Sequence, residues 1–122
     1  MASIFKLLSL TLFLGLVFQA YGECTLKDIS INQYKTSNLA RGKPVWNVNI
    51  TNNCICTQTQ VKLNCNGFQS YVNVDPTILN VSGNECLLNQ GQPIYHSQSI
   101  NFSYAWDTVF SFQPISSEIE CS

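Results

Sequence analysis

Several short stretches of the chain alternate between apolar and polar residues, which is the period-2 pattern of a strand with one buried face. Residues 45–50 and 100–106 show it most clearly, and residues 28–33 repeat it. In the first two stretches, the side chains predicted to face a core are Trp46, Val48, Ile50, Ile100, Phe102, Tyr104 and Trp106. The alternation therefore predicts three strands, each with a polar face turned to solvent.

The Asn66-Gly67 pair predicts a hairpin between residues 61–65 and residues 68–74. Asn-Gly is the preferred pair for a two-residue type I′ turn, whose twist matches that of the flanking strands. Pairing across such a turn would give both strands one shared apolar face. That face would consist of Val61, Leu63, Cys65, Phe68, Val72 and Val74.

Turn-forming residues separate two further β-prone stretches, residues 77–81 and 108–115. Gly, Pro and Asn recur between all of these segments, and no amphipathic helical pattern is found after residue 22. The chain is therefore predicted to be all-β, as a small disulfide-stabilised antiparallel β-sandwich of about seven or eight strands.

The first 22 residues have the pattern of a secretory signal peptide. Lys6 gives a basic start, residues 7–18 are mostly apolar, and Ala20 and Gly22 are the small residues of a cleavage site. An uncleaved membrane anchor would need about 20 apolar residues, and this run is shorter. We therefore expect cleavage after Gly22, with no membrane insertion afterwards, and a secreted, extracellular domain formed by residues 23–122.

All six cysteines lie in the predicted secreted domain, at Cys24, Cys54, Cys56, Cys65, Cys86 and Cys121. An even number of thiols in an oxidising compartment predicts three disulfides. A bridge between Cys54 and Cys56 would close a very small, strained ring, so each is expected to bridge to a different partner. The remaining connectivities stay open. No metal site is expected, because structural zinc usually has two to four residues between paired thiolates.

After cleavage, the chain contains five Lys and Arg residues and seven Asp and Glu residues, which gives a net charge of −2. Such a surface gives no electrostatic basis for binding nucleic acid or an anionic membrane. Three N-glycosylation sequons begin at Asn49, Asn80 and Asn101. All three are predicted glycan acceptors, and the alternation turns Asn49 and Asn101 to solvent.

Residues for catalysis are sparse. The single histidine, His96, lies in a polar stretch, and no Gly-x-Ser-x-Gly elbow supports a catalytic triad. The carboxylates available for glycoside hydrolysis are Asp75, Glu85, Asp107, Glu118 and Glu120, and each is explained by a turn, a strand end or the surface. We therefore expect a protein that is not an enzyme and needs no cofactor.

Six sequence blocks, taken together with the positions of the six cysteines, form a combination that is specific enough to compare with known families. They are residues 42–48 (Gly-Lys-Pro-Val-Trp-Asn-Val), 52–54 (Asn-Asn-Cys), 61–65 (Val-Lys-Leu-Asn-Cys), 86–93 (Cys-Leu-Leu-Asn-Gln-Gly-Gln-Pro), 100–105 (Ile-Asn-Phe-Ser-Tyr-Ala) and 115–121 (Ile-Ser-Ser-Glu-Ile-Glu-Cys). From Cys24 to Cys121 the chain resembles the TAPETUM DETERMINANT family of small, cysteine-rich secreted plant proteins. One departure is Cys54-Ile55-Cys56, which is tighter than the Cys-x-x-x-Cys of the founding member.

The resemblance implies an extracellular signalling ligand of the plant apoplast. Its partner would be the ectodomain of a leucine-rich-repeat receptor kinase, and its role would lie in cell-fate specification or reproductive development. If so, recognition should use loops and strand edges whose ordering cost the disulfides reduce. The candidate receptor-facing loop consists of Asn89, Gln90, Gly91, Gln92 and Pro93.

The alternative function is an extracellular module that binds cell-wall carbohydrate without catalysis. Its rings would come from Trp46, Trp106, Tyr34, Tyr71, Tyr95 and Tyr104. The alternation assigns Trp46, Tyr104 and Trp106 to the core and Tyr71 to the polar face. A flat row of exposed aromatic side chains would favour this alternative.

Overall fold

The computed structural model describes residues 24–121, and the predicted signal peptide of residues 1–22 lies outside them. The described chain contains seven strands and two short 3-10 turns. The strands are β1 (Ile29–Ala40), β2 (Lys43–Asn52), β3 (Thr57–Asn64), β4 (Leu79–Ser82), β5 (Glu85–Leu88), β6 (Ser99–Ala105) and β7 (Gln113–Glu120), and the turns are η1 (Leu26–Asp28) and η2 (Asn89–Gly91). The predicted all-β class and strand number are confirmed.

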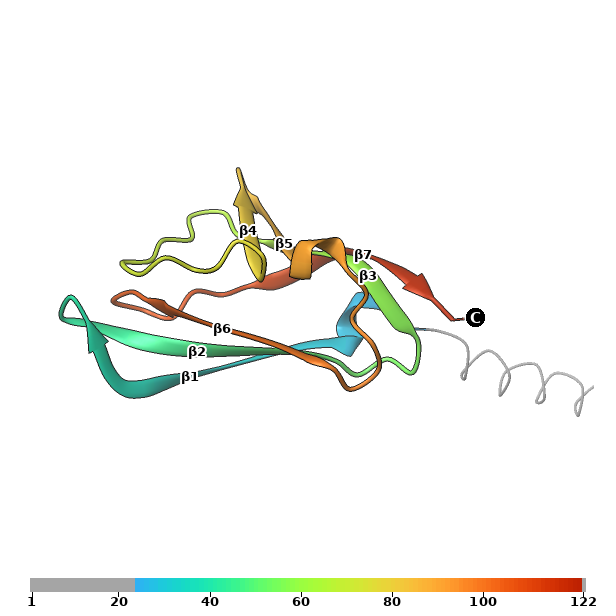
Figure 1. Ribbon diagram of the computed structural model, residues 1–122, viewed down its shortest axis with the longest axis horizontal. Coiled ribbons are helices and arrows are strands. Elements are labelled where there is room, and N and C mark those ends of the chain that lie inside the picture. Colours follow the sequence, from blue (N-terminus) through green and yellow to red (C-terminus); the bar gives the residue numbers. More distant parts are fainter. Residues whose placement is uncertain (1–23, 122) are drawn as a thin grey trace, which may run out of the picture.

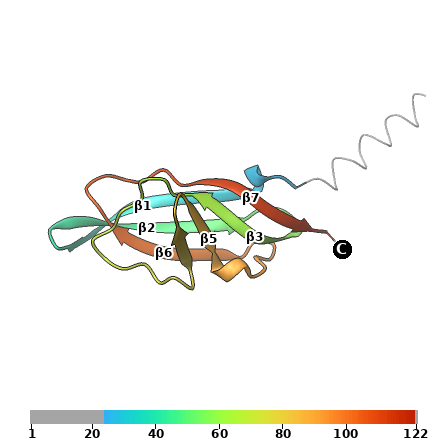
Figure 2. The same ribbon diagram turned by 90° about the horizontal axis from the view of Figure 1, so that it is seen from above.

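The strands form two antiparallel sheets that pack face to face (Figure 1). One sheet has the order β1-β2-β6 and the other has the order β4-β5-β3-β7. Seen from above, β3 and β5 cross obliquely over the three-stranded sheet (Figure 2). Each sheet buries one face against the other, which is why the strands show period-2 alternation.

The core lies between the two sheets and confirms the predicted alternation. Val48 and Ile50 of β2 are 1% exposed, and Tyr104 of β6 is fully buried. The buried core cluster consists of Ile29, Val48, Ile50, Val61, Leu63, Cys65, Leu79, Cys86, Leu88, Ile94, Ile100, Phe102, Tyr104 and Phe112.

A group of packed aromatic rings fills one region of this core. Phe112 contacts Phe68, Phe102, Tyr104 and Phe110, with ring centroids 4.8 to 5.9 Å apart. Most of these pairs meet edge to face, the geometry in which an aromatic pair adds about 0.5–1.5 kcal/mol beyond its buried area.

The hydroxyl group of Tyr104 organises the connection between β6 and β7. It donates to Oε1 of Gln33 at 2.6 Å and accepts from the backbone N–H of Phe110 at 2.8 Å. The amide of Gln33 in turn donates to the carbonyl oxygen of Phe110 at 2.6 Å. Burial raises the pKa of Tyr104. Side chains of β1 and β6 thus hold both backbone groups of Phe110.

The predicted hairpin between residues 61–65 and 68–74 is wrong. β3 pairs with β5 on one side and β7 on the other, and residues 65–78 contain no strand. The turn itself forms, because the N–H of Phe68 donates to the carbonyl of Cys65 at 2.9 Å. Of its two central residues only Gly67 has a positive φ, whereas a type I′ turn needs two. The chain therefore leaves β3 in a different direction.

Residues 68–74 lie beside β6 and still reach the core. The N–H of Tyr71 donates to the carbonyl of Ala105 at 2.9 Å, and the N–H of Ala105 donates to the hydroxyl of Ser70 at 3.0 Å. Phe68 and Val74 pack against the core cluster. A loop, and not the second strand of a hairpin, thus packs Phe68 and Val74 against the core.

The strand predicted at residues 108–115 is displaced. β7 begins only at Gln113 and continues to Glu120. Residues 106–112 are irregular because Phe110 and Phe112 are drawn into the ring cluster, and because Gln33 and Tyr104 take the backbone groups of Phe110. The alternation also did not predict β5, which has only four residues.

Candidate interaction surfaces

All six cysteines are paired in the described structure. The bridges join Cys24 with Cys54, Cys56 with Cys121, and Cys65 with Cys86. As predicted, Cys54 and Cys56 bridge to different partners. The sulfur atoms of Cys24, Cys54 and Cys56 lie within 4.8 Å of one another, but each is already bonded to another sulfur. This cluster therefore offers no thiolate to a metal ion.

Two of the bridges meet at one short turn, Cys54-Ile55-Cys56, which we call the double-disulfide turn. It joins β2 to β3 and is bonded to Cys24 before η1 and to Cys121 after β7. Both ends of the described chain are therefore anchored at the same end of the sandwich, on the right in Figure 1.

A buried amide supports this turn. The Asn52 side chain is fully buried, and its Nδ2 donates to the carbonyls of Cys56 at 3.0 Å and Ile94 at 2.8 Å. Its Oδ1 accepts from the N–H of Cys54 at 3.0 Å and from Nε2 of Gln58 at 3.1 Å. No motif in the sequence marks Asn52 as a supporting residue of the turn. The available signal was its even position in β2, which puts a polar residue on the core face.

The network reaches β7 through Gln58, which is also fully buried. The Ser117 hydroxyl donates to Oε1 of Gln58 at 2.7 Å. The backbone of Gln58 exchanges two hydrogen bonds with Ile94, at 3.1 and 2.8 Å. The β2–β3 turn, the β5–β6 connection and β7 are thus held together by two amide side chains.

The candidate receptor-facing loop, residues 89–93, has an uncommon backbone. Asn89, Gln90 and Gly91 all have positive φ angles, of 53°, 57° and 76°. Gln60, in β3 beneath them, has a φ of 50°, and its Nε2 donates to the carbonyl of Gly91 at 3.3 Å. Gln90 and Gln92 are exposed. A positive φ is strained for residues other than glycine, and such backbone strain clusters at functional sites.

Gly91 should be the least replaceable residue of this loop. A Cβ at Gly91 would lie 2.6 Å from Nε2 of Gln60 and would also carry the strain of a positive φ. We expect Gly91→Ala to lower the free energy of unfolding by about 2–3 kcal/mol, because the positive φ costs about 1–2 kcal/mol and the Gln60 amide must swing aside and lose its hydrogen bond to the Gly91 carbonyl. Gly83→Ala is the matched control, because Gly83 has a φ of 61° and open space around its Cβ position. The Gly83→Ala variant should lose only about 1–2 kcal/mol of unfolding free energy. Equal losses in urea unfolding would contradict a role for the Gln60 contact.

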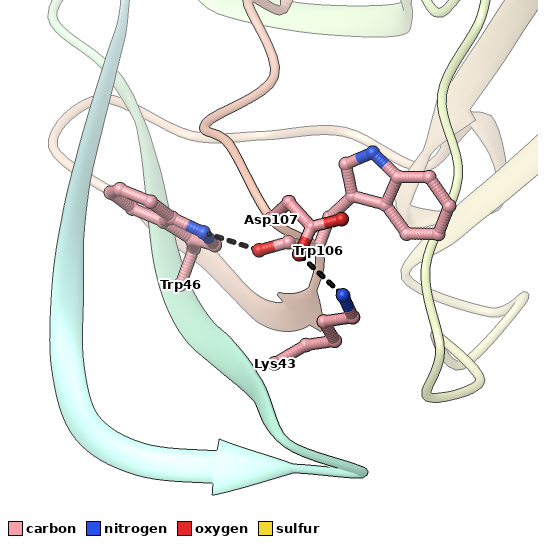
Figure 3. A network of polar contacts seen from close by, with 4 residues as sticks. All are labelled: Lys43, Trp46, Trp106 and Asp107. Atoms are coloured by element: carbon pink, nitrogen blue, oxygen red, sulfur yellow. Dashed lines mark hydrogen bonds and ion pairs between the residues drawn. The ribbon is translucent and has the colours of Figure 1, made fainter.

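At the other end of β2, aromatic side chains pack on one another. Tyr71 stacks on Trp106 with ring centroids 4.9 Å apart, and the indole of Trp46 donates to the carbonyl of Trp106 at 3.2 Å. Lys43 forms an ion pair with Asp107 at 2.6 Å (Figure 3). Trp46 and Trp106 are half-buried against the core cluster. These rings therefore do not form the flat exposed row that would favour a carbohydrate module.

The outer face of the three-stranded sheet is polar. Asn49 of β2 lies opposite Asn32 of β1 and Asn101 of β6. A cavity of about 260 Å³ opens on this face, bordered by the exposed ring of Tyr34 and by Asn47, Asn49, Asn101 and Ser103. The amide of Asn47 donates to the hydroxyl of Tyr34 at 3.2 Å, and the hydroxyl of Ser103 donates to Oδ1 of Asn47.

The three sequons differ in exposure. Asn80 and Asn101 are exposed, whereas Asn49 is half-buried in the central strand and accepts from the Thr51 hydroxyl at 2.8 Å. We expect secreted protein to carry glycans at Asn80 and Asn101. Molecules with a glycan at Asn49 should be depleted, because folding would crowd that glycan against its neighbours on both sides.

Mass spectrometry of glycopeptides from secreted protein checks this prediction site by site. Asn49→Gln is the control, because it should leave the glycan mass unchanged, whereas Asn80→Gln and Asn101→Gln should each lower it. A fully occupied Asn49 beside an empty Asn101 would contradict the expected order.

The possible catalytic residues lie on five different segments of the described chain. The His96 ring hydrogen-bonds to the carbonyl of Cys54 at 2.8 Å, and Asp75 accepts from the N–H of Thr77 at 2.9 Å. Oε2 of Glu85 forms an ion pair with Nζ of Lys62 at 3.8 Å. Asp107 pairs with Lys43 as described above. Glu118 and Glu120 are exposed on β7. Each described group thus has a structural partner or a surface position.

Among residues 24–121, no helix is long and apolar enough to cross a membrane. Residues 25–122 match the family described as Tapetum determinant 1, C-terminal. TPD1 protein homolog 1 of Arabidopsis thaliana is 31% identical over 102 residues, which cover 81% of this chain and 56% of that protein. TPD1 protein homolog 1A of Oryza sativa subsp. japonica is 30% identical over 86 residues, 63% of this chain and 38% of that protein.

The chain therefore spans about half the length or less of these two relatives. No solved structure matches it. The family match extends from the residue after Cys24 to the end of the sequence, and so includes every strand and five of the six bridged cysteines. The chain belongs to the Tapetum determinant 1 family.

Proposed function

We propose that the protein is a secreted signalling ligand for the ectodomain of a plant leucine-rich-repeat receptor kinase. Family membership is the observation that carries this proposal, because the resemblance seen in the sequence implies such a ligand. The role would lie in cell-fate specification or reproductive development, and the place of action would be the apoplast.

The architecture supports binding through loops. Two disulfides and the Asn52 amide hold one end of the sandwich, so the loops there lose little conformational freedom when a partner binds. Protein–protein recognition of this kind relies on a few well-placed side chains. It does not need a deep cavity such as a small-molecule site has.

Binding of the secreted protein to a panel of purified leucine-rich-repeat receptor kinase ectodomains tests the proposal. We expect saturable binding to at least one of them by biolayer interferometry. Reduced and alkylated protein is the control and should not bind, because its loops are no longer held. Binding to none of the ectodomains, together with measurable binding to glucan or pectin, would overturn the ligand function.

One observation favours carbohydrate binding as a second function. The cavity on the outer sheet face combines an exposed tyrosine ring with neutral amide and hydroxyl groups. An aromatic ring packs on the apolar face of a sugar, and neutral polar groups bind its hydroxyls. Because Asn101 borders this cavity and is a predicted glycan acceptor, calorimetry with cell-wall oligosaccharides uses deglycosylated protein. It should then show binding that Tyr34→Ala abolishes. Tyr95→Ala, which removes an equally exposed ring elsewhere, is the control. Heat signals that are the same for both variants would exclude this cavity.

A further inference from the structure

Ile55 presents an apolar side chain to solvent at the tip of the double-disulfide turn. It is 73% exposed, which is the highest value among the exposed large apolar residues of the described chain. Tyr95, in the β5–β6 connection, is 60% exposed. Exposing these two side chains to water is unfavourable, by about 25 cal/mol for each square ångström of apolar surface.

The turn cannot fold inward to bury Ile55. On one side, the N–H and carbonyl of Cys54 are bound by Asn52 and by His96, at 3.0 and 2.8 Å. On the other side, the carbonyl of Cys56 accepts from Asn52 at 3.0 Å. Both flanking cysteines are also held by disulfides. The backbone around Ile55 is therefore fixed before any partner arrives.

The same contacts bring Tyr95 to this end of the molecule. Nδ2 of Asn52 donates both to the carbonyl of Cys56 and to the carbonyl of Ile94, the residue before Tyr95. His96, the residue after Tyr95, binds the carbonyl of Cys54. Ile55 and Tyr95 are thus exposed on two turns that hydrogen bonds hold together, and we call the two side chains the Ile55–Tyr95 surface.

Two acidic residues lie at the end of β7 that the Cys56–Cys121 bridge joins to the double-disulfide turn. Glu120 lies opposite Thr57, the residue after Cys56, and Glu118 lies opposite Thr59. Both carboxylates are exposed. The two ion pairs found among residues 24–121 join Lys43 with Asp107 and Lys62 with Glu85, so neither Glu118 nor Glu120 forms an ion pair there.

We propose that the Ile55–Tyr95 surface is the anchor that docks the protein on its receptor ectodomain. This inference rests on the proposed ligand function and names the surface that performs it. A rigid aliphatic and aromatic pair gives a binding hot spot without a large ordering cost. The exposed carboxylates beside it match a receptor surface in which an apolar pocket is bordered by Lys or Arg side chains.

Ile55→Asp tests the anchor against a receptor ectodomain that binds the wild-type protein. We expect the Kd to rise by about 30-fold or more, the size of effect that a hot-spot residue produces. The variant should keep the wild-type melting temperature, because Ile55 makes little buried contact. Leu39→Asp is the matched control, since Leu39 is 68% exposed near the β1–β2 turn at the opposite end of β2. Its affinity should be unchanged.

The Glu118→Gln/Glu120→Gln double variant tests the charged border. We expect slower association and a weaker dependence of the association rate on salt, while dissociation stays near the wild-type rate. Wild-type affinity of the Ile55→Asp variant would overturn the anchor and leave the ligand function standing. A loss of affinity in Gln90→Ala alone would then place receptor binding in the loop of residues 89–93. A wild-type protein that binds no ectodomain would overturn both.

Discussion

Replacing Asn52 by alanine is expected to lower the free energy of unfolding by about 3–5 kcal/mol. The substitution removes four hydrogen bonds, to Cys54, Cys56, Gln58 and Ile94, from a side chain that is fully buried. A buried polar group left without a partner costs about 1–3 kcal/mol. Urea unfolding with the disulfides intact measures the loss.

Asn53→Ala is the matched control, because Asn53 is the exposed neighbour and its side chain donates only to the Ser30 hydroxyl. It should change the stability by less than about 1 kcal/mol. Asn52→Asp separates lost hydrogen bonds from lost volume, since aspartate fills the same space but cannot donate to both carbonyls. Its loss should be smaller at acid pH, where the buried carboxyl group takes up a proton. A pH-independent loss equal to that of alanine would contradict this account.

Removing the Cys56–Cys121 bridge with Cys56→Ala/Cys121→Ala is expected to cost about 4 kcal/mol. The bridge closes the longest loop of the three, with a sequence separation of 65, and so restricts the unfolded chain most. That loss is a large part of the 5–15 kcal/mol by which domains of this size are usually stable. Thermal and urea unfolding, with mass spectrometry to confirm two remaining bridges, measure the effect.

The loss should also have a local signature. The bridge ties the end of β7 to the double-disulfide turn, so its removal should free the last residues of that strand. We expect faster hydrogen exchange at residues 118–120 than in the Cys24→Ala/Cys54→Ala variant, whose missing bridge includes no residue next to β7 in the chain. Unchanged protection at the end of β7 together with an unchanged unfolding midpoint would show that the β3–β7 pairing alone holds this strand.

The candidate surfaces were partly visible in the sequence. The spacing of Cys54 and Cys56 predicted two different partners, and alternation predicted the polar faces of β2 and β6. The turn residues of the loop 89–93 indicate a surface connection, but its run of positive φ angles is not predictable from the sequence, because two of the three residues are not glycine. No sequence pattern marks Ile55, since a lone apolar residue between two cysteines has no periodicity.

The sequence by itself determined which side chains of β2 and β6 face the core, how many cysteines could pair and which family the chain resembles. Alternation is a local property, because neighbouring side chains of a strand must point to opposite faces. The tertiary structure alone decided which strands pair. An Asn-Gly turn favours a hairpin after β3, yet the Cys65–Cys86 bridge and the aromatic ring cluster favour β5 and β7 as its partners. Those contacts join residues far apart in the chain, so no local pattern contains them.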